Sequence, residues 1–490
     1  MNAEYIRHAE SEEIEENCVE SAAVSNLVWT TEKFKPKVHN FNPRNSGIQT
    51  GIKISWKIID YFQLFVSEEL MEYIVEKTNS YWQQKKNNNE ILTGTNLSEL
   101  YCFIAICLLM TCNKRLSLAE HWSRDKLLRS DIFSDIMSRD RYFLLLRMLY
   151  FSDNQVSSSD RLGKIRKIID ELRAAFSNTF YLFSNLCIDE SLLLYKGRLS
   201  FKQFIPSKRN RFGIKSFVLC DCKTGYIQDF IVYTGGDTTI GPKNKDYGKS
   251  GSMVMSLLEP YLGKGHTLYV DNWYTSPALF DVLHKNYTNA CGIVKKRRKG
   301  MPKMDEKLKK GEACFRSAGN MLAIKWQDKK EVWMISTVHK AEFADVKKRY
   351  STQNIVQKPS CVLEYNKLMD AVDKTDMVIS TIHSTRKTIK CSPALFNLLH
   401  TNVTNACGTV KRRRKGMPVM DRKLEKGEVD FRISSNLLAL KWRDKRDVLM
   451  LSTFHTSEFI STGKRNYRTQ EIASRKGSLD IQDPDDQAED

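Results

Sequence analysis

The chain has 490 residues, of which 41% are hydrophobic, and it carries a formal net charge of +19. This length exceeds what one compact core can hold, so we expect two to four domains. The charge favours a polyanionic partner, and nucleic acid fits better than an anionic membrane surface, although charge alone leaves a merely basic soluble protein open. The longest hydrophobic run, residues 101–110, is too short to span a bilayer, so we expect no membrane partner.

Both ends of the chain are acidic, unlike the basic body between them. Residues 1–20 contain seven glutamates, and residues 480–490 read DIQDPDDQAED. Such segments cannot bury enough apolar surface to fold, so we predict disordered acidic tails over residues 1–48 and 471–490. The twelve cysteines form no paired CxxC clusters, which favours free thiols, and we expect no zinc.

The first third of the chain has the hydrophobic pattern of helices. Mixed spacings of three and four residues separate the apolar side chains from about residue 56 to residue 75, and again over residues 97–112. A further amphipathic helix carries one apolar stripe, which consists of Ile165, Ile168, Ile169, Leu172 and Phe176. We therefore predict a helical region ahead of any sheet.

After residue 184 the pattern changes to the period of two that is typical of strands. The predicted strands are residues 186–190, 213–222, 226–234 and 268–271. Helical spacing returns over residues 253–262, and Ser276 with Pro277 opens another helix. Strands that alternate with helices in this way predict an α/β core.

A long segment of the chain is duplicated. Residues 276–353 recur as residues 392–470 at a constant offset of 116, until one inserted residue near the end, and about two thirds of the positions match. Within the first copy, residues 320–337 predict two strands around a charged turn, so each copy should hold a small β module. Asp271 precedes the first copy, whereas Lys387 stands at the equivalent place before the second. Chemistry that needs Asp271 can therefore occur only once.

Three aspartates are candidates for a two-metal site. Asp189 ends the first predicted strand, Asp271 ends a later one, and Asp373 lies on a late helix. Ends of neighbouring strands can meet, and a helix packed across them can bring a third carboxylate, which is what phosphoryl transfer with two cations requires. Any one of these residues could equally be an ordinary turn or surface aspartate, but their order on the alternating pattern favours a site.

Three groups of basic residues are candidates for contacts with DNA phosphates. They are Lys208, Arg209, Arg211 and Lys215; Lys295, Lys296, Arg297 and Arg298; and Lys411, Arg412, Arg413 and Arg414. The first group is interleaved with Phe204 and Phe212, which makes it the best candidate of the three. The other two also suit nuclear import, and a solvated face is the alternative for each.

The sequence resembles piggyBac-type transposases. The matching stretches lie in family order over residues 49–390 and are Asp60-Tyr-Phe-Gln-Leu-Phe65, Thr78-Asn79-Ser-Tyr81, Ser138-Arg-Asp-Arg-Tyr142, Phe151-Ser-Asp-Asn154, Asp189-Glu190-Ser191, Gly197-Arg-Leu-Ser-Phe-Lys202, Gly213-Ile-Lys215, Val270-Asp271-Asn272, Tyr365-Asn366 and Val372-Asp373. The resemblance implies an RNase H-like catalytic core with an inserted β-containing domain, preceded by an α-helical domain for dimerisation and DNA binding. The implied boundaries are 49–155 for the helical domain, 156–290 and 355–391 for the core, 291–354 for the insertion domain and 392–470 for its duplicate.

The resemblance also implies a function. It is cut-and-paste transposition of double-stranded DNA, typically at TTAA, by a nuclear protein that we expect to be a homodimer. Asp189, Asp271 and Asp373 would be the catalytic residues and would bind two Mg²⁺ or Mn²⁺ ions, with Asp376 as a further metal ligand on the same helix.

Two departures from the family keep a second function open. Asp370-Ala371 stands where the family usually has Gly-Gly, and the duplicated copy replaces the family's closing helix and cysteine-rich zinc domain. The helix predicted at residues 392–400 could substitute for the closing helix. The alternatives are therefore an active transposase and a catalytically inactive, transposase-derived protein that binds DNA or chromatin; a purely structural protein would leave the aspartates unexplained.

Overall fold

The computed structural model describes most of the first 381 residues and short parts of the remainder. The described residues are 27–49, 51, 57–85, 94–153, 160–195, 197, 199–206, 211–236, 238, 240, 247–347, 355–381, 407–409, 425, 428–434, 437–443, 447–452, 460–465 and 472–475. The chain divides into two compact units, residues 1–52 with 56–402 and residues 53–55 with 403–490. The predicted helix at 392–400 and the predicted tails at 1–26 and 476–490 lie outside the described residues.

Helices form the first part of the larger unit, as predicted. They are α1 (Ile58–Gln63), α2 (Glu68–Lys85), α3 (Leu97–Cys112), α4 (Asp131–Ile136), α5 (Arg139–Met148) and α6 (Arg166–Thr179). Asn96 caps α3 by accepting a hydrogen bond from the Glu99 backbone N–H at 2.9 Å. Two Arg141 nitrogens bind the Glu99 carboxylate at 2.6 and 2.7 Å, which links α5 to α3. No described helix is long and apolar enough to cross a membrane.

One mixed sheet runs through the larger unit. Its strands are β3 (Asn185–Leu194), β4 (Gln203–Phe204), β5 (Phe212–Asp221), β6 (Ile227–Val232), β7 (Thr267–Val270), β8 (Asn289–Ile293), β9 (Ala313–Ala318), β10 (Met321–Gln327) and β11 (Glu331–Ser336). The order is β4-β5-β3-β7-β8-β11-β10-β9, with β6 paired to β5. Only the β3–β7 and β7–β8 pairs are parallel. The inserted strands β9–β11 thus extend the core sheet through β8.

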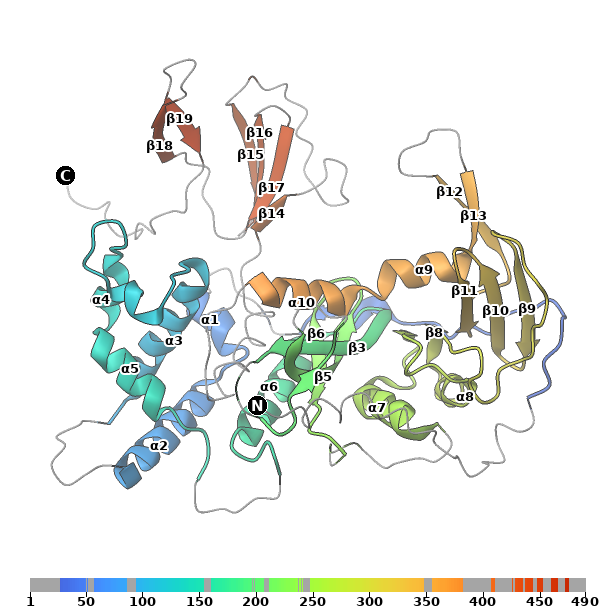
Figure 1. Cartoon of the computed structure of the whole chain (residues 1–490), viewed down its shortest axis with the longest axis horizontal. Helices are drawn as coiled ribbons and strands as arrows, with labels where there is room; N and C mark the ends of the chain where they lie inside the picture. The colour runs from blue at the N-terminus through green and yellow to red at the C-terminus, as the bar shows by residue number, and fades with distance from the viewer. Residues whose placement is uncertain are drawn as a thin grey trace. The chain divides into compact units, whose positions relative to one another are not determined.

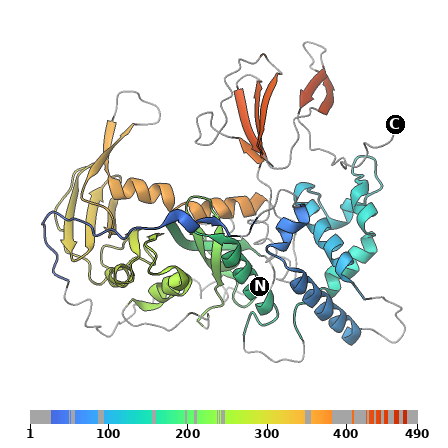
Figure 2. The ribbon, with the colours of Figure 1, turned by 180° about the vertical axis from the view of Figure 1, so that it is seen from behind.

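Helices cover both faces of this sheet (Figures 1 and 2). On one face, α7 (Gly248–Leu258) and α8 (Pro277–Lys285) pack on a core that includes Ile188, Phe217 and Phe280. On the other, α9 (Ser360–Leu368) packs on Tyr269 and Cys291, and α10 (Ala371–Thr381) follows it along β3. A residue's place in the two-residue alternation of β3 therefore decides which pair of helices it faces.

Phe280 is a direct test of the core beneath the sheet. Its side chain on α8 is 0% exposed and belongs to the cluster under β3 and β7. We expect Phe280→Ala to lower the free energy of unfolding by about 3–5 kcal/mol, because it leaves a cavity where a ring was packed. Denaturant unfolding checks this, with Phe343→Ala as a control because the Phe343 ring is 44% exposed.

An N-terminal segment packs on the core where we predicted a disordered tail. The Phe34 ring is buried against the sheet, and Thr30 pairs with Ser317 of β9 through two backbone hydrogen bonds of 2.8 Å. At its end, β1 (Gly47–Ile48) pairs with β2 (Phe180–Tyr181). The tail predicted over residues 1–48 is therefore wrong for residues 27–48, where aromatic residues follow the glutamate-rich stretch and supply apolar surface to bury.

The second unit repeats the strand pattern of the insertion. Its strands β14 (Cys407–Thr409), β15 (Val429–Ser434), β16 (Leu437–Arg443) and β17 (Asp447–Ser452) pair in the order β14-β17-β16-β15, which corresponds to β8-β11-β10-β9 at an offset of 116. Two further strands, β18 (Ile460–Arg465) and β19 (Ile472–Arg475), correspond to β12 (Phe343–Lys347) and β13 (Ile355–Pro359) at an offset of 117. The repeat therefore continues to residue 475, past the predicted end at 470. No described strand of this unit corresponds to β7.

Candidate metal centre

Asp189 and Asp271 lie side by side where two parallel strands separate. The β3–β7 ladder ends at the pair Ile188↔Val270, and each aspartate is the next residue of its strand or of the loop that follows. The sequence predicted that aspartates at the ends of neighbouring strands would meet in this way. The prediction that Asp189 ends its strand is wrong, however, because β3 continues to Leu194 in an antiparallel ladder with β5.

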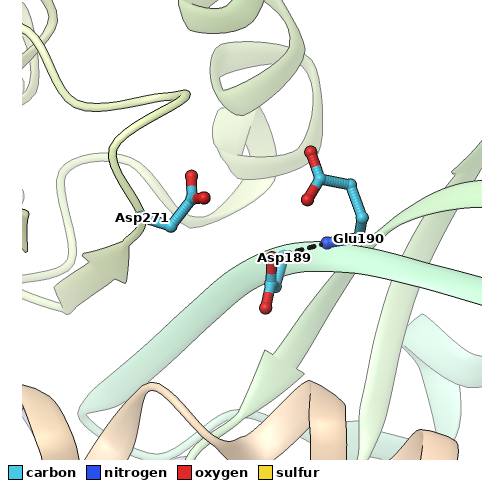
Figure 3. A group of neighbouring side chains, drawn as sticks. All are labelled: Asp189, Glu190 and Asp271. Atoms are coloured by element: carbon cyan, nitrogen blue, oxygen red, sulfur yellow. Dashed lines mark hydrogen bonds between the residues drawn. The ribbon is translucent and has the colours of Figure 1, made fainter. Parts of the chain in front are cut away.

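A third carboxylate, from Glu190, completes the cluster (Figure 3). One carboxylate oxygen from each of Asp189, Glu190 and Asp271 lies within 4.8 Å of the other two. The Glu190 backbone N–H also donates to Asp189 Oδ1 at 2.8 Å. Several carboxylate oxygens at one point are the donors that Mg²⁺ and Mn²⁺ prefer, so these residues fit such an ion.

Burial and charge make the ionised form of Asp271 unfavourable without a cation. Burial is the larger cause and the charge of Glu190 the next, and together they raise the Asp271 pKa above its ordinary value of 3.8. Backbone N–H groups of the following loop oppose the shift, and one of them, from Trp273, donates to Oδ1 at 2.9 Å. The site thus resembles many functional sites in holding like charges together.

This shift predicts how cation binding depends on pH. The protonated carboxyl is a poor ligand, so affinity for Mn²⁺ should fall as pH drops through the raised pKa of Asp271. The fall should begin at a higher pH than an aspartate with the ordinary pKa would give. Titration of Mn²⁺ followed by electron paramagnetic resonance at several pH values checks this; a pH-independent affinity down to the ordinary aspartate pKa would contradict it.

Two tyrosines border the cluster, Tyr274 after β7 and Tyr365 on α9. Burial, as the main cause, and then the nearby carboxylates raise both pKa values: Glu190, Asp189 and Asp271 act on Tyr274, and Asp271 and Asp189 act on Tyr365. Both rings are buried, at 1% and 6% exposure. They therefore reach the cluster as neutral phenols and limit the water around it.

Lys215 is the cation that the structure places beside these carboxylates. Its Nζ lies 3.3 Å from Glu190 Oε1, and its side chain is only 19% exposed. The same Nζ lies 4.9 Å from the ring centroid of Phe217, 5.3 Å from that of Trp273 and 5.8 Å from that of Tyr233. Cation–π contacts with three rings hold the ammonium group at Glu190.

The other two aspartates predicted to bind metal, Asp373 and Asp376, lie on α10, and neither belongs to the group of three carboxylates. Asp376 accepts a hydrogen bond from the hydroxyl of Ser191, two residues beyond Asp189 on β3. Asp373 is exposed and lies outside the group formed by Asp189, Glu190 and Asp271. A metal-binding role for Asp373 and Asp376 stays a prediction.

The unusual Asp370-Ala371 pair does not put an additional charge into the cluster. Asp370, directly before α10, is paired with Lys374 of that helix at 2.7 Å, with both side chains about half exposed. Asp370 also lies outside the group of three carboxylates. Ala371 is buried, at 4% exposure. Its methyl group is therefore accommodated in the packing of α10.

Of the basic residues predicted to contact DNA, Arg298 binds the loop after β7, and four other described residues are exposed at the surface. The Arg298 guanidinium donates to the carbonyl oxygens of Asn272 at 2.5 Å and Trp273 at 3.0 Å, so it fixes the loop that holds Asp271. The exposed members are Lys295, Lys296, Arg297 and Arg211. Lys208, Arg209, Lys411, Arg412, Arg413 and Arg414 lie outside the described residues.

Reasoning from the sequence did not place Glu190 in the carboxylate cluster, and it did not anticipate that Arg298 binds the loop after β7. Glu190 is adjacent to Asp189, and strict alternation along a strand would place the two side chains on opposite faces, so the strand pattern does not predict that they share a site. The available signal was the Asp189-Glu190 pair itself, with Lys215 predicted on the neighbouring strand. Nothing in the basic run from Lys295 indicated that one member would bind the backbone after Asp271.

The comparisons with known proteins agree with this fold. A family model described as "Transposase IS4" matches residues 59–390 and again residues 388–479, so its second match includes the duplicated copy. The fold and the family match define the class as transposases and transposase-derived proteins with an RNase H-like core. The chain belongs to the piggyBac-type family of transposases and transposase-derived proteins.

Two human proteins and one solved structure illustrate this family. The chain is 26% identical to PiggyBac transposable element-derived protein 2 over 72% of its own length and 27% identical to protein 3 of that series over 69%. These matches span only 61% and 58% of the relatives' lengths. A cryo-EM structure of a piggyBac transposase synaptic complex with hairpin DNA matches with a TM-score of 0.63 and 25% identity, over 73% of this chain and 75% of the other. The predicted α/β fold is confirmed.

Proposed function

We propose that the chain is a DNA transposase of the piggyBac type that cleaves and joins DNA strands at transposon ends. The observation that carries the proposal is the carboxylate cluster of Asp189, Glu190 and Asp271 at the end of the β3–β7 ladder. A bound Mg²⁺ or Mn²⁺ pair would activate the attacking hydroxyl and stabilise the leaving oxygen of the phosphodiester. Asp189, Glu190 and Asp271 would hold those ions, and Asp373 and Asp376 of α10 are the remaining candidates.

Other residues of the chain would prepare the site for DNA. Arg298 holds the Asp271 loop through two backbone carbonyls, and Lys215 forms an ion pair with Glu190 at 3.3 Å. The exposed residues Lys295, Lys296 and Arg297 follow shortly after β8 and would contact phosphates of a double-stranded DNA partner. By family resemblance the target is TTAA, the protein acts as a homodimer, and it works in the nucleus.

A nicking assay tests the proposal. The full chain should nick a plasmid that carries the inverted repeats flanking its own gene, in Mg²⁺ or Mn²⁺ and not in EDTA. Asp271→Ala should abolish nicking, whereas Asp305→Ala, at an exposed position outside the cluster, should not.

The second candidate is a catalytically inactive protein that binds DNA or chromatin. It is favoured by the duplicated module, which follows α10 and repeats the inserted strands without the Asp271 position. Salt-sensitive DNA binding without any metal-dependent nicking would select this candidate, and absence of DNA binding would exclude both.

A further inference from the structure

An exposed pair of phenylalanines lies on a basic hairpin at the edge of the sheet. The strands β4 and β5 place Phe204 directly opposite Phe212, with ring centroids 4.5 Å apart and planes inclined by 32°. The rings are 40% and 47% exposed. Among the aromatic pairs of the described residues, this is the one in which both rings are exposed. Leaving two neighbouring rings in water is unfavourable unless they meet a partner.

The pair is held in place by its own hairpin. The Ile205 backbone N–H donates to the Arg211 carbonyl at 2.9 Å, directly beside the ring pair. Two residues before β4, Phe201 is buried at 4% exposure and anchors the chain that enters this strand. The rings are therefore presented on regular backbone that is fixed at both strands.

The charge around the pair specifies an anionic partner. Arg211 is exposed and Lys202 is half-buried, and the sequence of residues 197–220 contains no aspartate or glutamate. The Lys202 Nζ lies 6.0 Å from the Phe212 ring centroid, and Arg211 precedes that ring in the sequence. A flat apolar ligand with attached negative charges fits this surface, and a nucleobase with its phosphates is such a ligand.

We propose that Phe204 and Phe212 form a stacking platform for an unpaired base of the DNA strand; this rests on the proposed DNA-binding function and deepens it. Inside a duplex both faces of a base are covered by its neighbours, so only an unstacked base can use the platform. Phe212 precedes Phe217, the cross-strand partner of Glu190, by five positions on β5. At about 3.4 Å per residue the platform is about 17 Å along the strand from the carboxylate cluster, or roughly five nucleotides.

Binding to paired and unpaired DNA tests the platform. In EDTA, to prevent cleavage, the full chain is titrated against a fully paired duplex and against the same duplex with a short unpaired stretch, by fluorescence anisotropy at one salt concentration. Wild type should bind the unpaired form more tightly. The double variant Phe204→Ala/Phe212→Ala should weaken binding to that form by about fivefold or more and leave binding to the paired duplex unchanged.

Three controls separate stacking from other effects. Phe343→Ala removes another exposed ring, on β12, and should change neither affinity. Phe204→Leu/Phe212→Leu keeps apolar surface without aromatic faces and should behave like the alanine variant. Arg211→Gln should weaken binding to both duplexes and reduce its dependence on salt.

The outcomes distinguish this inference from the function on which it rests. The platform is overturned if the alanine variant loses affinity for both duplexes equally or binds both as wild type does. It is also overturned if the variant binds normally but changes its oligomeric state in sedimentation. If wild-type protein binds neither duplex, the proposed function itself fails.

Discussion

Asp271→Asn is expected to abolish metal-dependent strand cleavage and, in the same variant, to raise the unfolding temperature of the metal-free protein. The cleavage rate should fall by a factor on the order of 10³ or more, because the amide cannot supply the charge that holds the catalytic cations. Affinity for paired duplex DNA in EDTA should stay close to that of wild type, since Asp271 is half-buried and belongs to the cluster rather than to the basic surface.

The gain in stability follows from the sign of the Asp271 pKa shift. An acid whose pKa is raised by folding stabilises the fold only below its unfolded pKa, and it loses that contribution as pH rises through the folded value. At neutral pH the wild-type carboxylate is therefore a net cost, due to burial and to repulsion by Glu190. Asparagine removes the charge, so the thermal midpoint should rise by a few degrees at neutral pH and hardly change near pH 4.

A matched control makes this prediction specific. Asp305→Asn changes an exposed aspartate of the same chain and should alter neither cleavage nor the midpoint. A destabilised but active Asp271→Asn protein would show that the carboxylate is structural. Thermal unfolding in EDTA and in Mn²⁺ measures the effect: Mn²⁺ should stabilise wild type much more than the variant.

The sequence predicted the parts of the site that depend on strand ends. Asp189 and Asp271 follow apolar runs that pair as parallel strands, and both come directly after the last paired residues of the ladder. The order of strands and helices was sufficient for the α/β core. The repeat was also sufficient to predict the second β module, since its strands keep the offset of the sequence alignment.

The remainder of the site depends on contacts that a linear pattern does not contain. Lys215 was assigned to DNA from its basic neighbours. Three surrounding rings, from β5, from the residue after β6 and from the loop after β7, direct its ammonium group to Glu190. Asp376 is on a correctly predicted helix, but the rotation of α10 brings it to Ser191. Residues 27–48 looked like a tail because they have no periodicity of their own and are ordered by pairing with distant strands.

Lys215→Met is expected to destabilise the metal-free protein, and Glu190→Gln is expected to restore much of that loss. The Lys215–Glu190 pair is less than one-fifth exposed on either side, at 19% and 17%. Removing one partner of such a pair leaves the other charge without compensation and costs on the order of 3 kcal/mol. Methionine is an unbranched side chain similar in length to lysine and can remain beside the Phe217 and Trp273 rings, so the loss should report charge rather than volume.

A double-mutant cycle separates this pair from its surroundings. Denaturant unfolding of wild type, Lys215→Met, Glu190→Gln and the double variant gives the coupling free energy, which should be positive and well above that of the exposed pair Lys285–Asp281. Additive single effects would contradict the role of Lys215 as the counter-charge of Glu190.

The response to a cation then connects the pair to function. A divalent ion at the cluster would replace the positive charge lost with Lys215, so Mn²⁺ should stabilise Lys215→Met by more than it stabilises wild type. Lys215→Arg keeps the charge and should stay close to wild type in metal-free stability. If Mn²⁺ stabilised all of these variants equally, the cation would not bind beside Glu190, and the three carboxylates would have to be explained without a metal.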